Sequence, residues 1–218
     1  MGTRTRSLWP QRTTFWAGVC FVVAALLAVL VFTQFAVAVT RTFSLFVPNP
    51  IAIVLAAAVR AAGFVIAALG LRGEAGVAAD SRLGKAALIL FGAGNLVYAV
   101  ESLFPFGTAD GPPSPVLLVA HTALAVAVPI AALVAAVIVY RVAVLGGVAR
   151  WFLLPIGVVD LVLLALEFGP FRDLLVALNL LPVEFLQPAL LAALGAAYLV
   201  HGRGEAVKHR AQVINENW

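Results

Sequence analysis

Residues 51–71 read IAIVLAAAVRAAGFVIAALGL, a stretch in which Arg60 is the only charged residue. About 20 consecutive apolar residues, wound as an α-helix, cross the hydrocarbon core of a lipid bilayer. A helix that is apolar on every side must be buried in a large core or in a membrane, and a chain that is 63% hydrophobic has more apolar surface than a water-soluble fold could hide. The stretch therefore predicts a transmembrane helix, in which Arg60 needs an explanation of its own.

Five further apolar stretches accompany the first, and together the six predicted helices cover 15–39, 51–71, 86–104, 116–140, 151–168 and 174–200. The shortest predicted helix is about 27 Å long, which is just enough to cross a bilayer. Pro182 and Pro188 are predicted kink points of the last helix, because proline removes a backbone donor. We expect one all-α domain, a polytopic membrane bundle of six transmembrane helices over 15–200, between a segment 1–14 and a tail 201–218.

The composition agrees with this fold. Of the 218 residues, 63% are hydrophobic and 11% are charged, and the mean hydropathy is +1.08. Because about 25% of residues are charged in soluble globular proteins, a soluble enzyme and a disordered chain are both excluded. Cys20 is the only cysteine, so the chain cannot be an intrachain disulfide scaffold.

The basic residues are divided unevenly between the two sides of the predicted bundle. Eleven of the fourteen Lys and Arg residues fall in segment 1–14, in connections 72–85 and 141–150, and in the tail. Arg41 and Arg172 lie in the other connections. Because cytoplasmic loops are enriched in Lys and Arg, we expect both termini in the cytoplasm. The basic start and apolar run imitate a signal peptide, but the run is longer than the core of about 7–15 residues in such peptides, so we expect this helix to be retained.

Several polar residues fall inside the predicted helices, where an ionisable side chain costs about 2.5–3.5 kcal/mol at the helix centre. With the termini in the cytoplasm, they lie at mid-depth or in the outer third, which predicts a cavity opening away from the cytoplasm. The candidate ligand-binding residues are Arg60, Asn95, Tyr98, Glu101, His121, Asp160, Glu167, Glu184 and Gln187, and Asn179 lies among them. A plainer interpretation stays open, in which head groups solvate the outer residues and the central charges form a structural ion pair.

Two contacts follow from the predicted depths. Glu101 and His121 flank the short connection between the third and fourth helices, so we expect their side chains to approach each other. Arg60 stays protonated and cannot reach the bilayer surface from the midplane, so it needs a partner inside the bundle. Asp160 and Glu184 have the matching depth, and we expect a salt bridge from Arg60 to one of them.

The residues support no specific cofactor. A bis-histidine haem site needs a second intramembrane histidine, and His121 with Glu101 and Glu167 lacks a diagnostic zinc spacing. The chain contains no phosphate-binding glycine loop and no nucleophile elbow. We therefore predict no cofactor and no metal, name no catalytic residue, and expect bound lipid as the one candidate non-protein component.

Leu103-Phe104-Pro105, Asp110 in the following connection and His121 at the start of the fourth helix resemble an uncharacterised prokaryotic family of six-helix membrane proteins, catalogued as domain of unknown function 998. The resemblance covers about residues 50–200 and implies the fold but no activity. The preference for Arg over Lys, with abundant Ala, Val, Gly and Leu, favours a GC-rich bacterial genome, so we expect the bacterial cell membrane as the location.

Three functions remain open. The chain could bind an apolar or amphiphilic ligand in an outward-facing cavity, as a carrier or lipid-handling factor, which is the interpretation that we favour. It could be an accessory subunit of a larger membrane complex, or an intramembrane enzyme that uses His121 and the carboxylates. The expected partners are membrane lipids, with other membrane subunits as an alternative, and no nucleic acid.

Overall fold

The computed structural model describes residues 11–40, 50–101, 103, 115–168 and 181–216, apart from the side chains of 11, 32–40, 167–168, 181–184 and 205–216. In these ranges the regular elements are all helical, and six of them are long and apolar enough to cross a membrane. They are α1 (Gln11–Thr40), α2 (Pro50–Leu69), α3 (Arg82–Glu101), α4 (Pro115–Val142), α5 (Leu153–Phe168) and α7 (Leu181–Glu216), with the short 3-10 helix η1 (Gly147–Arg150) before α5. The predicted all-α architecture is confirmed at this level.

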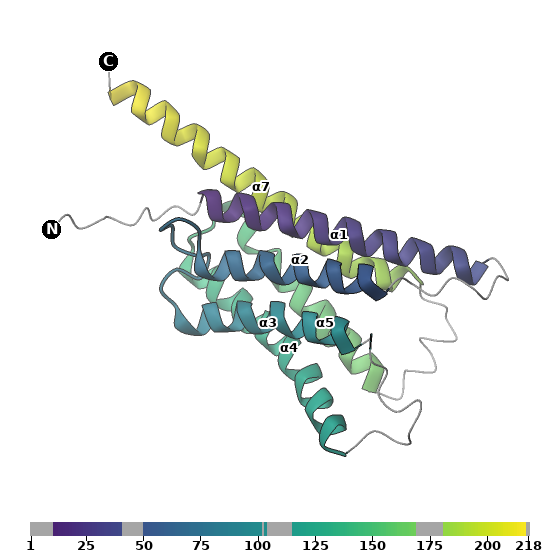
Figure 1. Cartoon of the computed structure of the whole chain (residues 1–218). Coiled ribbons are helices and arrows are strands. Elements are labelled where there is room, and N and C mark those ends of the chain that lie inside the picture. Colours follow the sequence, from purple (N-terminus) through teal and green to yellow (C-terminus); the bar gives the residue numbers. More distant parts are fainter. Residues whose placement is uncertain (1–10, 41–49, 102, 104–114, 169–180, 217–218) are drawn as a thin grey trace.

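The helices are arranged as a closed series in chain order (Figure 1). Each packs against the next, and α7 returns to pack along α1, which is the most extensive contact in the bundle. The series closes between α5 and α7 through a much smaller contact. Because α2 and α5 are not neighbours, a side chain that joins them must cross the interior.

The two ends of the bundle differ in charge. We call the end where α1 begins the basic end. Connections 70–81 and 143–152 lie there and contain Arg72 and Arg150. The adjoining helix ends carry Arg12, Arg82, Lys85 and Arg141. The other end, where α1 and α3 finish and α2 and α4 begin, is called the opposite end. Arg203 of α7 lies over Phe15 of α1, with 5.9 Å between the guanidinium carbon and the ring centroid, which places this part of α7 at the basic end.

The centre of the core is a chain of buried aromatic rings. Phe64 of α2 stacks against Phe21 of α1 at 4.6 Å and against Phe91 of α3 at 4.8 Å between ring centroids. Phe21 also meets the ring of Tyr198 of α7 at 5.8 Å. Such tilted and edge-to-face aromatic pairs add to the stabilisation from burial. These rings therefore join four helices, α1, α2, α3 and α7.

Connection 70–81 fastens the start of α1. One oxygen of Glu74 accepts a hydrogen bond from the backbone N–H of Arg12 at 3.1 Å, and the other accepts from the N–H of Thr13 at 2.8 Å and from its hydroxyl at 2.9 Å. The Thr13 hydroxyl accepts in turn from the N–H of Leu71 at 2.9 Å. The first N–H groups of a helix have no partner in the helix itself and favour a negative charge. Glu74 thus performs the role of an N-cap from a distant part of the chain.

The last predicted helix needs two corrections. We expected its end at 200, whereas α7 continues to Glu216 and forms most of the predicted tail. Pro182 was a predicted kink point, but it is the second residue of α7, where its missing N–H would have had no helical partner. Pro188 does lie inside the helix. The predicted start at 174 lies outside the described residues.

Candidate functional site

A buried ion pair crosses the interior of the bundle. Arg60 Nη2 of α2 lies 3.8 Å from Asp160 Oδ2 of α5, and the two side chains are 10% and 9% exposed. The predicted salt bridge from Arg60 to a mid-depth carboxylate is therefore confirmed, with Asp160 as the partner. At 3.8 Å the pair attracts electrostatically but is too long for a hydrogen bond.

The guanidinium is held loosely for a buried charge. Its Nε and Nη2 atoms are buried and have no hydrogen-bond partner in the part of the chain that the structure describes. Its carbon lies 5.0 Å from the ring centroid of Phe91, within the range of a cation–π interaction. Buried polar groups in proteins almost always find a hydrogen-bond partner, so two unsatisfied donors on one arginine call for an explanation.

Asp160 is shared between two helices. Gln187 of α7 donates a hydrogen bond from Nε2 to Asp160 Oδ1 at 2.6 Å, while the other carboxylate oxygen faces Arg60. Asp160 thus connects α5 with α7, the neighbouring long helices that share the smallest contact. Asn95 of α3 is another of the predicted mid-depth residues. Its side-chain amide donates a hydrogen bond to the backbone carbonyl of Phe91, one turn earlier in the same helix, at 2.7 Å.

Two cavities adjoin these residues in the half of the bundle nearer the opposite end. The larger, of about 340 Å³, lies among α1, α2, α3 and α7. Four polar residues, Arg60, Asn95, Tyr98 and Gln187, contribute to a lining that is otherwise apolar. Small side chains leave the space open, since the lining includes Ala24, Ala28, Ala56, Ala57 and Ala99. We call it the Arg60 cavity.

The smaller cavity, of about 260 Å³, lies among α3, α4, α5 and α7 and is more polar. It is bordered by His121 and Asp160, and we call it the Asp160 cavity. Asn95, Tyr98 and Gln187 line both cavities, so these three side chains form the partition between them. The ion pair therefore has its positive member in one cavity wall and its negative member in the other.

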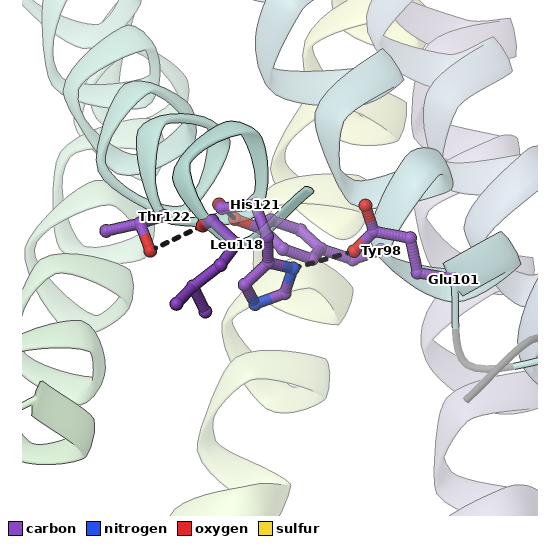
Figure 2. A network of polar contacts seen from close by, with 5 residues as sticks. All are labelled: Tyr98, Glu101, Leu118, His121 and Thr122. Atoms are coloured by element: carbon purple, nitrogen blue, oxygen red, sulfur yellow. Dashed lines mark hydrogen bonds and ion pairs between the residues drawn. The ribbon is translucent and has the colours of Figure 1, made fainter. Parts of the chain in front are cut away.

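A second polar pair lies closer to the opposite end. Glu101 is the last residue of α3, and its Oε2 atom lies 2.9 Å from Nδ1 of His121 in the second turn of α4 (Figure 2). Tyr98 meets the His121 ring edge-on at 5.3 Å between centroids, and its hydroxyl donates to the carbonyl of His121 at 3.4 Å. The predicted approach of Glu101 and His121 is confirmed. Their side chains are 21% and 41% exposed, so the pair lies at a rim rather than in the core.

Six of the nine candidate residues thus line the two cavities, and a seventh, Glu101, contacts His121. The side chains of Glu167 and Glu184 lie outside the described residues, as does Asn179. Among the described residues, no three His, Cys, Asp or Glu side chains are grouped closely enough to hold a metal ion.

Sequence reasoning missed two residues. Pro129 lies inside α4 and borders the Asp160 cavity. Because proline has no N–H, it leaves the carbonyl of Ala125, one turn earlier on the same cavity wall, without its helical donor. A proline in the middle of a long apolar run was a readable signal. Glu74 carried none, because a carboxylate in a short charged connection is typical of a solvated loop.

The chain was also compared with known proteins. No protein-family model, no curated protein and no solved structure matches it.

Proposed function

We propose that the six helices span a lipid bilayer and that both termini face the cytoplasm of a bacterial cell. The length and apolar character of the helices support insertion. The excess of Lys and Arg at the basic end supports the orientation. With this orientation, the two cavities occupy the outer half of the membrane domain.

We further propose that the protein binds an apolar or amphiphilic ligand in the Arg60 cavity, as a carrier or lipid-handling factor. The observation that carries this proposal is the cavity itself: about 340 Å³ of space whose lining is mainly apolar and includes four polar side chains. Ligand sites commonly have volumes of about 300–1,000 Å³, an apolar lining and a few polar groups that fix orientation.

Filling the cavity tests the proposal. Ala57 lines the cavity, whereas Ala62 on the same helix is exposed and does not. We expect the Ala57→Trp variant, purified in mild detergent, to lose an amphiphile that co-purifies with the wild-type chain in native mass spectrometry. The matched Ala62→Trp variant should retain it. Equal retention by both variants, each confirmed to be monodisperse, would contradict binding in this cavity.

A further inference from the structure

We infer that the ligand of the Arg60 cavity is an amphiphile with an oxyanion head group, and that its binding is coupled to the uptake of one proton by Asp160. The head group replaces Asp160 as the partner of Arg60. This inference rests on the proposed function, because it names the class of ligand and the accompanying ion for the same cavity.

The state of Arg60 indicates a negatively charged ligand. Arg60 lines a cavity in which the other polar residues described are uncharged. Its Nε and Nη2 atoms, which have no hydrogen-bond partner among the described residues, lie on the same edge of the planar guanidinium. That edge matches the two oxygens of a carboxylate or phosphate, and such charge-assisted bidentate bonds are stronger than a 3.8 Å contact. An oxyanion would therefore be a better partner than Asp160 in its observed position.

The loss of Arg60 as a partner would leave Asp160 as an isolated buried charge. Asp160 is 9% exposed and lies between apolar residues of α4 and α5 that line the same cavity. A carboxylate stranded in such surroundings takes up a proton rather than remain charged. A proton on Oδ2 leaves Oδ1 able to accept the bond from Gln187, so the contact between α5 and α7 is retained.

The charges balance in both states. Without ligand, the positive charge of Arg60 is matched by Asp160. With ligand, it is matched by the oxyanion, and Asp160 is neutral. The net reaction brings in one anion and one proton, so Arg60 and Asp160, the charged pair described in the interior, never leave an unmatched charge.

The Asp160 cavity provides a route for the proton. It is bordered by Asp160, by Tyr98 of α3 and by His121 of α4, which contacts Glu101 at the rim. Arg60 of α2 and Gln187 of α7 are the charged and polar groups that face Asp160 from the remaining helices, among the side chains described. A histidine between the rim and a buried acid is an arrangement suited to proton transfer.

Calorimetric titration of the full chain in nanodiscs tests the coupling. Decanesulfonate stays ionised, so protons taken up on its binding go to the protein, and they are counted by repeating the titration in buffers of different ionisation enthalpy. We expect about one proton per bound decanesulfonate in the wild type and none in the Asp160→Asn variant. Binding of decanesulfonate to the wild type without proton uptake would overturn the coupling.

The role of Arg60 is tested with the same probe and with decanol, which is neutral. The Arg60→Gln/Asp160→Asn double variant keeps the interior uncharged. It should lose at least about tenfold more affinity for decanesulfonate than for decanol, which corresponds to one lost charge-assisted contact. Unchanged decanesulfonate affinity in the double variant would overturn the assignment of the head group.

Two further comparisons identify the chemical class of the head group and distinguish a failure of this inference from a failure of the proposed function. Decanoate and decyl phosphate distinguish a fatty acid from a phospholipid-like phosphate by which of them binds more tightly. If decanol binds the wild type but not Ala57→Trp, and the anions show no dependence on Arg60, only the present inference fails. If Ala57→Trp binds decanol like the wild type, the proposed function fails as well.

Discussion

Arg60 and Asp160 explain how this chain keeps two charges in an apolar bundle. Each side chain alone would cost several kcal/mol inside a membrane or a dry core, and the pair reduces that cost without hydrogen-bonding directly. The geometry is loose, so the pair adds little to stability compared with a well-packed apolar contact. Its significance lies in what would happen if one member were removed.

The losses of stability caused by substituting Arg60 and Asp160 should be strongly non-additive. We expect Arg60→Gln and Asp160→Asn to destabilise the protein by about 3–5 kcal/mol each, because each leaves the other charge stranded. The double variant should lose less than the sum. Unfolding by detergent denaturant, followed by circular dichroism, gives the four free energies of the cycle. Additive losses would show that the two side chains do not interact.

Glu74 should stabilise the start of α1. Its carboxylate accepts three hydrogen bonds from Arg12 and Thr13, so the Glu74→Ala variant should lose about 1–2 kcal/mol, the cost of removing a helix cap. Asp80, in the same connection, is exposed, and Asp80→Ala is the matched control. The same unfolding assay should separate the two variants. A loss of equal size in both would indicate that only the charge of the connection matters.

The sequence could predict those contacts that follow from the depth of each residue in the predicted membrane helices. Arg60 and Asp160 lie at similar depth in apolar stretches, and Glu101 and His121 flank one connection, so a topology estimate was enough to bring each pair together. Glu74 depends on how connection 70–81 folds back on α1, which no hydropathy pattern contains. Gln187 was among the candidates, but its role as the amide donor to Asp160 depends on the rotation of α7 about its axis.

Among the helices, α1 and α7 make the most extensive contact. Gly18 and Gly195 face each other, and a methyl group added to Gly195 would lie 2.9 Å from the carbonyl oxygen of Gly18 and 2.8 Å from a methyl of Val22. Small residues let helices pack backbone to backbone in this way. The contact holds the last helix of the series against the first.

A methyl group at Gly195 should separate these two helices. We expect Gly195→Ala to destabilise by about 1–3 kcal/mol, because backbone atoms cannot move aside as a flexible side chain can. Gly204 lies on the same helix with nothing within 4 Å of the added atom, so Gly204→Ala should be neutral or stabilising by up to about 1 kcal/mol. Comparison of the two unfolding midpoints checks the prediction. Equal effects would contradict close packing at Gly195.

Helix positions were largely predictable, and helix ends were less so. The first five predicted helices agree with α1 to α5 to within about four residues at each end, because long apolar runs are the strongest signal in a sequence. For the last helix we predicted an end at 200, where the apolar run stops. A helix ends where its backbone hydrogen bonds end, and residues 205–216 contain neither proline nor glycine to interrupt them.

Across the whole molecule, the main packing contacts and the two cavities lie towards different ends of the bundle. The aromatic core, the Glu74 cap and the Gly18–Gly195 contact lie towards the basic end, whereas both cavities lie towards the opposite end. The small contact between α5 and α7 also carries the Asp160–Gln187 hydrogen bond. The half of the bundle with these packing contacts therefore supports the half with the cavities, and a ligand that enters the bundle would do so at the opposite end.

The orientation of the molecule in the membrane is the prediction on which this picture depends. A cytoplasmic reporter fused after residue 218 should be active, because the basic end is expected to stay in the cytoplasm. The same reporter inserted within 108–111, in the predicted connection on the other side, should be inactive, and a phosphatase that needs export should show the reverse pattern at both positions. Removing the positive charges of Arg72, Arg82 and Lys85 together should weaken this bias, since the orientation follows the difference in basic residues between the two sides. Activity of the cytoplasmic reporter at 108–111, with the phosphatase active after 218, would invert the bundle and place both cavities on the cytoplasmic side.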